Sequence, residues 1–209
     1  MPVKIPFPLT LDYVRSASTS ALFASLQSWV KASDPTCLVH PHGFAVVLLR
    51  SGFEDWRLHW WPKGPRILTG MPGMIHTHDK MIESRILTGQ IKNVLYDVSA
   101  VTAGGQPVYE VAYAGNKYVR NTANVLQKTA ERVRARVSNI QTLKAGDCYR
   151  IENHVYHEAI VPDDAVTATI VCMHSPSPGP IKVIGLDGYP EHLEFQRIER
   201  RAAEYMGFV

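Results

Sequence analysis

The chain has 209 residues, of which 45% are hydrophobic and 20% are charged, so it has enough material for one full-sized globular domain. A formal net charge of +3, spread evenly along the chain, does not indicate a nucleic-acid partner. The three cysteines are far apart and form no CxxC pair, which argues against a zinc ribbon or a disulfide framework. Residues 1–16 lack the pattern of a signal peptide, and no apolar run approaches the roughly 20 residues that span a bilayer. We therefore expect a cytoplasmic protein with no membrane contact.

The first part of the chain, residues 1–42, reads as an extension with one amphipathic helix over 17–33. Apolar residues fall at helical spacing from Leu22 to Val30, and Asp34-Pro35 ends the run. We expect this helix to pack outside the core.

The second part is a succession of short strand-like runs with glycine and proline between them. Glycine and proline each number 14, as expected for many strands joined by turns. One segment, 127–137, could instead form a helix by composition, but Val133, Ala135 and Val137 alternate with arginines and favour a strand. Strands are predicted within 43–50, 56–62, 84–98 (two strands around Gly89), 107–113, 132–140 and 165–174. This pattern predicts an all-β sandwich or barrel.

The third part, residues 190–209, carries the end signals of a helix over 190–207. Pro190 suits the first helical position, Glu191 and Glu194 lie in the first turn, and Gly207 follows the last turn. We expect this helix to pack on a barrel formed by residues 43–189, giving one domain overall.

The segment that carries chemistry runs from Gly70 to Gly89 and contains His76-x-His78. In a strand, side chains two apart point to the same face, so this pair can place two imidazoles in one barrel interior. Neutral imidazole binds zinc, iron, nickel or copper. A third ligand has to come from a distant strand, and His157 can supply it.

These residues resemble the cupin superfamily, whose first motif reads G-x5-H-x-H-x(3,4)-E-x6-G and whose second reads G-x5-P-x-G-x2-H-x3-N. The first motif is matched nearly throughout, and the second is matched at its first glycine and its histidine. The matching residues are Gly70, His76, His78, Glu83 and Gly89, then Gly146 and His157. The resemblance implies a double-stranded β-helix, or jelly roll, that holds one metal ion through His76, His78, Glu83 and His157.

Two departures from the motifs leave parts of the site open. Counting forward from His78 puts the acidic ligand at Glu83, whereas counting back from Gly89 puts Ile82 there. A one-residue slip turns a side chain to the opposite face, so a site of three histidines alone, as in the thiol-dioxygenase branch, is the alternative. In the second motif Glu152, His154 and Val161 replace the proline, the glycine and the final asparagine, so the turn before His157 must be built differently.

The other histidines receive different interpretations. His40 and His42 flank a proline in an early loop and are interpreted as surface residues, and His154 as a turn residue. His59 is interpreted as a packed core residue, with lining of the cavity as the alternative. His174 ends a strand expected beside the site, and either it or Arg85 would orient the substrate, with Glu83 as fourth ligand or proton acceptor.

A metal held by three or four protein ligands keeps positions open for substrate or oxygen. The resemblance therefore implies a metal-dependent oxidoreductase, a dioxygenase of a small organic acid, thiol or enediol-like molecule, with Fe(II) as the first choice of metal and zinc, nickel or manganese as alternatives. An isomerase or epimerase, or a non-catalytic cupin that binds a metal or small ligand, are the competing interpretations. We also expect a homodimer, through residues 56–61 or the N-terminal helix, because open sheet edges need cover.

Overall fold

The computed structural model describes residues 4–68, 70–113 and 123–208. Two α-helices precede the strands and a short one follows them: α1 (Leu11–Ser16), α2 (Thr19–Ser33) and α3 (Ala202–Tyr205). The strands are β1 (Thr36–His40), β2 (Phe44–Arg50), β3 (Asp55–Trp61), β4 (Met81–Thr88), β5 (Gln90–Ala100), β6 (Gln106–Tyr113), β7 (Asn124–Lys144), β8 (Cys148–Ile151), β9 (Tyr156–Ile160), β10 (Thr167–His174), β11 (Ile181–Ile184), β12 (His192–Phe195) and β13 (Ile198–Arg201). The predicted fold class, mainly β with helices near both ends, is confirmed.

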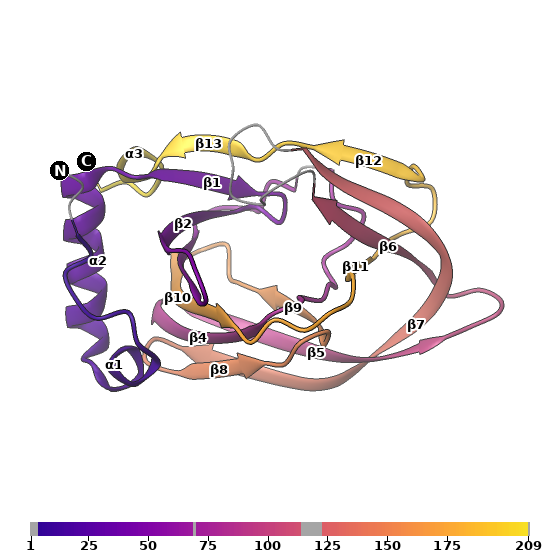
Figure 1. The fold of residues 1–209 in the computed structure, drawn as a ribbon, viewed down its shortest axis with the longest axis horizontal. Helices are drawn as coiled ribbons and strands as arrows, with labels where there is room; N and C mark the ends of the chain where they lie inside the picture. Colours follow the sequence, from indigo (N-terminus) through magenta and orange to yellow (C-terminus); the bar gives the residue numbers. More distant parts are fainter. Residues whose placement is uncertain (1–3, 69, 114–122, 209) are drawn as a thin grey trace.

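The strands form two antiparallel sheets that curve around a shared interior (Figure 1). The first sheet has the order β13-β1-β2-β3-β10-β4-β8, and the second has the order β11-β6-β7-β5-β9, with β12 paired to β7. Strand β7 pairs first with β6, over 124–133, and then with β5, over 133–144. The region considered as a possible helix is thus one continuous strand, as its alternating residues indicated.

A short extended segment around His76 joins the two edges of the second sheet. His76 exchanges both backbone hydrogen bonds with His157 of β9, each 3.0 Å long. On its other side Thr77 donates to the Lys182 carbonyl and Ile184 of β11 donates to the Ile75 carbonyl, both at 2.9 Å. This segment therefore sits between β9 and β11, which fixes the backbone of His76 directly beside that of His157.

Helix α2 covers the outside of the first sheet, as the sequence predicts. Ser18 caps its start by accepting from the Ala21 amide, and Asp34 ends it in the left-handed conformation with φ 38°. Its buried residues Leu22, Leu26, Trp29 and Val30 join one cluster with residues of β2, β3 and β10. Burial of this apolar stripe is what holds the helix.

Strand β3 is an inner strand of the first sheet, paired to β2 and β10. Trp56, Trp60 and Trp61 are at most 4% exposed. Residues 56–61 are therefore buried within this chain and do not offer the intersubunit contact expected of them. Homodimer formation itself stays a prediction.

The helix predicted over 190–207 is much shorter, and this expectation is corrected. Strand β12 pairs with β7, β13 pairs with β1, and only Ala202–Tyr205 is helical. Both strands complete exposed sheet edges, and backbone pairing there outweighs the local helix preference. A residue distant in the sequence stabilises the start of α3, because the Asp34 carboxylate accepts a hydrogen bond from the Ala203 amide at 3.0 Å. Strands β1 and β13 also extend the first sheet beyond the boundaries 43–189.

Among the described residues, no helix is long and apolar enough to cross a membrane.

The turn between β4 and β5 depends on Gly89, one of the glycines of the first motif. Its φ is +75°, and a Cβ there would lie 2.4 Å from both the Thr167 hydroxyl and the Val166 carbonyl oxygen. We expect Gly89→Ala to lower the free energy of unfolding by about 3 kcal/mol, because backbone strain and a clash with β10 add together. Urea unfolding measures the loss.

Gly188→Ala is the matched control, because Gly188 has φ +89° but a Cβ added there would meet nothing within 4 Å. We expect Gly188→Ala to lower the free energy of unfolding by about 1 kcal/mol, through backbone strain alone. Equal losses in the two variants would show that the close approach to β10 has no energetic effect.

Candidate metal centre

Three imidazoles meet between the sheets. His76 and His78 lie in the segment between β3 and β4, and His157 lies on β9. One ligand atom from each falls within 4.8 Å of the others, and the Nε2 atoms of His76 and His78 are 3.1 Å apart. His157 is 4% exposed. The structure thus brings together the three histidines that the sequence predicted.

Backbone carbonyls orient two of these rings. The Nδ1 atom of His76 lies 2.8 Å from the Met74 carbonyl oxygen, and Nδ1 of His157 lies 3.0 Å from that of Val155. A carbonyl oxygen can only accept, so each Nδ1 carries the proton and donates it, and the lone pair of each ring lies on Nε2. A ligating histidine ordinarily has such a partner on its other nitrogen.

Burial keeps the same rings neutral. Desolvation lowers the pKa of His76 and lowers that of His157 to about 3, the latter helped by the neighbouring His76. Neutral imidazole is the form that binds metal, so protons compete weakly at these two nitrogens near neutral pH.

The donor set fits a divalent first-row metal. Metal–nitrogen bonds of about 2.1 Å at right angles place two nitrogens about 3 Å apart, which is the spacing of the His76 and His78 Nε2 atoms. Imidazole suits iron, zinc, nickel and copper alike, so the donors identify a class of metals and not one metal.

A cavity of about 100 Å³ opens beside the three histidines. Its wall contains three arginines, further histidines and aromatic rings, and no aspartate or glutamate among the described residues. The polar side chains that line it are His40, His42, Arg57, His59, Arg66, His76, His78, Asn93, Tyr149, His157 and Arg197, together with the indole of Trp61. A small ligand that enters meets cations and neutral donors.

His40 and His42 belong to this wall, and their interpretation as surface residues is wrong. His42 is 3% exposed, its ring centroid lies 4.7 Å from that of His76, and burial lowers the pKa of both residues well below its usual value. The Pro41 turn after β1 folds His42 back over the centre. The sequence did contain a signal for these two residues, because they form a second His-x-His pair. The proline between them, Pro41, argued against a strand there. His59 also lines the cavity, which was the alternative interpretation for it.

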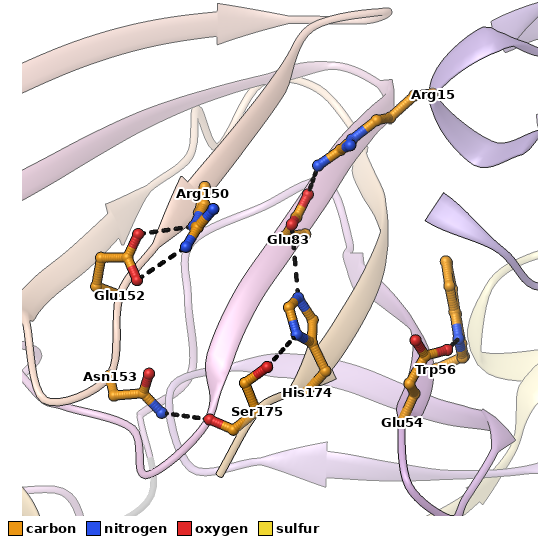
Figure 2. A network of polar contacts seen from close by, with 9 residues as sticks. All are labelled: Arg15, Glu54, Trp56, Glu83, Arg150, Glu152, Asn153, His174 and Ser175. Atoms are coloured by element: carbon orange, nitrogen blue, oxygen red, sulfur yellow. Dashed lines mark hydrogen bonds and ion pairs between the residues drawn. The ribbon is translucent and has the colours of Figure 1, made fainter. Parts of the chain in front are cut away.

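Glu83 does not reach the three histidines. On β4 its neighbour Ile82 lines the cavity, so alternation turns Glu83 to the outer face of the sheet. There its carboxylate binds Arg15 of α1 and faces His174 (Figure 2). The position inside the barrel is therefore taken by Ile82, as the count back from Gly89 gave, and not by Glu83. The candidate site consists of three histidines alone, which was the alternative to a site with Glu83.

His174 lies with Glu83 on the outer face. Its Nδ1 is 2.8 Å from the Ser175 hydroxyl, and its Nε2 is 3.5 Å from a Glu83 oxygen (Figure 2). Its side chain is absent from the wall of the cavity. The expected role of His174 in orienting the substrate is not supported by this placement. His154 is in a turn with φ +59°, as predicted.

Arg85 holds the N-terminal helices in place and does not line the cavity. Its guanidinium donates to the carbonyls of Val14 and Ala17, the latter at 2.8 Å, and to the Thr19 hydroxyl at 2.6 Å. These acceptors connect the end of α1 to the start of α2, so the role expected in orienting the substrate is corrected to a structural one.

We expect Arg85→Met to lower the free energy of unfolding by about 2–3 kcal/mol, because the buried carbonyl oxygen of Val14 and the half-buried one of Ala17 lose their guanidinium donor. Metal stoichiometry should be unchanged. Chemical unfolding and metal analysis of the same sample test both statements, with Arg150→Met on the exposed neighbouring strand as the control. A loss of metal in Arg85→Met alone would connect Arg85 to the centre after all.

Comparisons with known proteins give likenesses in structure only. No family model and no curated protein matches the chain. Among solved structures, an RmlC-like cupin from Shewanella frigidimarina is 18% identical, with a TM-score of 0.35 over 65% of this chain and 78% of that one. A variant of oxalate decarboxylase from Bacillus subtilis is 10% identical, with a TM-score of 0.37 over 68% of this chain and 28% of that one. The DMSP lyase DddQ from Ruegeria pomeroyi is 12% identical, with a TM-score of 0.44 over 91% of this chain and 83% of that one.

Every one of these TM-scores is below 0.5. The fold is therefore described by its strand order alone. Two antiparallel sheets enclose a His-x-His pair and a distant histidine that meet in a shared interior. Two curved antiparallel sheets around a shared interior agree with the mainly β, jelly-roll fold class that the sequence predicted.

Proposed function

We propose that the chain is a metal-dependent oxidoreductase, a dioxygenase that acts on a small organic acid, thiol or enediol-like molecule and uses Fe(II). The observation that carries the proposal is the centre itself, with three imidazoles beside a cavity that no carboxylate of the described residues lines. When bound, the metal would supply a redox-active Lewis acid with open positions for substrate and oxygen.

The absence of a carboxylate from this donor set has an electrostatic consequence. Three neutral ligands leave the full charge of a divalent ion in place, and Arg66 and Arg197 add positive charge on the described wall. An anionic substrate donor is therefore favoured at the centre, which fits a carboxylate, thiolate or enediolate.

The chain's own residues perform three tasks in this proposal. His76, His78 and His157 hold the ion, and the carbonyls of Met74 and Val155 fix the orientation of two of those rings. Apolar side chains of β8 and β10, Ile151, Val171 and Met173, line the cavity and limit the entry of water.

Oxygen uptake tests the proposal. Protein reconstituted with Fe(II) without oxygen would be mixed with aerated buffer and a panel of thiols, hydroxy acids and enediols, and uptake would be followed with an electrode. We expect uptake for one class of substrate, lost in His76→Ala and kept in His174→Ala, which changes a histidine outside the cavity. Stoichiometric metal with no uptake across the panel, but with ligand-dependent stability, would favour a binding protein. Cytoplasmic location and the homodimer remain predictions.

A further inference from the structure

Asn93 is a buried amide with no partner on either polar atom. It is 1% exposed, and both its Nδ2 and its Oδ1 atoms lack a hydrogen-bond partner. It lines the cavity of the metal centre. Buried side-chain amides are almost always bonded, because an unbonded one loses its interaction with water and gains nothing. An unbonded amide on a cavity wall is therefore a feature that a ligand would satisfy.

The sheet register places Asn93 close to the centre but not on it. Asn93 of β5 pairs with Ala159 of β9, and His157 is two residues before Ala159 on the same face. Such diagonal neighbours have side chains starting about 7–8 Å apart. Ala159 also lines the cavity, and its small side chain leaves space between the amide and the histidine.

Two further polar groups gather around Ala159. The Arg66 guanidinium donates to the Ala159 carbonyl oxygen, and Trp61 belongs to the same apolar cluster as Ala159. Trp61 lines the same cavity, and its indole nitrogen is buried without a hydrogen-bond partner. This end of the cavity, formed by Asn93, Arg66, Trp61 and Ala159, is called the amide subsite below.

The two polar atoms of the Asn93 amide need different hydrogen-bond partners, and this limits the classes of ligand that can satisfy both. Nδ2 donates and Oδ1 accepts, so a ligand satisfies both only if it offers an acceptor and a donor together. A carboxylate or thiolate accepts only, and an ammonium donates only and would lie near the Arg66 charge. A hydroxyl is the smallest group that does both, and the cavity is small.

We propose that the amide subsite binds the hydroxyl end of a short organic anion whose anionic end lies at the metal centre. The substrate class is thus a short-chain hydroxy acid. This inference rests on the proposed function for the position of the anionic end, and on Asn93 for the hydroxyl.

Paired probes test the subsite in zinc-loaded protein, since zinc undergoes no redox reaction. Calorimetry would compare 3-hydroxypropionate with propionate, and 4-hydroxybutyrate with butyrate. We expect the hydroxyl of the better-fitting pair to tighten binding about 10-fold, the effect of one well-placed hydrogen bond in a dry site. Succinate and 4-aminobutyrate, which end in an acceptor only and a donor only, should gain nothing over butyrate. Preference for succinate would mean that Arg66 and not Asn93 selects the ligand, and would overturn the proposal.

Asn93→Leu removes the amide at similar volume, and Asn93→Val does so with less bulk. Both should abolish the preference for the hydroxyl acid and leave zinc stoichiometry intact. In the metal-free protein without probe, the better tolerated of the two should raise Tm by about 2–4 °C, because an unsatisfied buried amide is lost.

Asn124→Leu is the matched control. Asn124 is also buried, at 3% exposure, but its Nδ2 donates to the Phe195 carbonyl at 3.4 Å, away from the cavity. It should lower Tm and keep the preference. If both Asn93 variants lower Tm as Asn124→Leu does, Asn93 is a partnered structural residue and the proposal fails.

The two proposals fail in different ways. A wild-type protein that binds no zinc would overturn the proposed function, while the Tm comparison still tests the amide subsite. Stoichiometric zinc together with equal affinity for hydroxy and deoxy acids would overturn the subsite alone.

Discussion

The His157→Ala variant is expected to lose stoichiometric metal, with a fall in affinity of more than about 100-fold. Even the residues that only orient metal-binding histidines contribute 10- to 100-fold, so removal of a ligand should exceed that range. His157 is one of the three proposed ligands, and the other two, His76 and His78, come from one short segment. Metal analysis of purified protein and competition with a chelator measure the change, and His76→Ala should behave in the same way.

His174→Ala is the control for this experiment. It removes an imidazole that is half-buried, like that of His76, but that contacts Ser175 and Glu83 outside the cavity. Its metal content should equal that of the wild type, and circular dichroism should confirm that all three variants are folded. Retention of one metal per chain by both His76→Ala and His157→Ala would remove the basis of the proposed function.

The strands and the meeting of the three histidines could be predicted because their signals are local or geometric. Alternating apolar residues in 84–98 and 132–140 specify which face of a strand is buried, wherever its partner lies. A His-x-His pair on extended chain puts both rings on one side, as happens at His76 and His78. Only the identity of the partner, His157, needed the resemblance to a family.

Glu83 shows where such reasoning reached its limit. The turn at Gly89 and the strand pairing set which face of β4 each residue takes, and the two possible counts differ by one residue. In the structure Ile82 lies opposite Met173 and Ile151, all three lining the cavity, while Glu83 lies opposite Cys172 and Arg150. A charge at position 83 is kept on the outer face, where Arg15 of α1 compensates it.

The C-terminal segment and the early histidines were misread for another reason. Strand β13 forms because β1 offers an open edge, and β1, with five residues, is too short to give a clear strand pattern in the sequence. His42 approaches His76 only because β1 and β2 form a hairpin around Pro41. Both the strand at 198–201 and the position of His42 depend on strand pairing, which a local sequence pattern does not show.

Acid should destabilise the metal-free protein over the range in which its buried histidines resist protonation. Desolvation, with Arg57 and Arg197 nearby, lowers the pKa of His59 to about 3 from 6.5. Between these two values the unfolded chain binds a proton at this site and the folded chain does not. Stability therefore rises with pH across that window, and it is lost as the pH falls from about 6.5 towards 3.

His59→Leu isolates this contribution without touching a proposed ligand. The variant takes up one proton fewer than the wild type when it unfolds. Its free energy of unfolding should therefore change less steeply with pH, by about 1.4 kcal/mol per pH unit between about pH 6 and pH 4. Over two pH units the variant should thus gain about 3 kcal/mol relative to the wild type. Urea unfolding at several pH values, in the presence of a chelator, measures the two slopes. Parallel slopes would mean that His59 is already protonated in the folded protein, and that the wall of the cavity carries more positive charge than its three arginines.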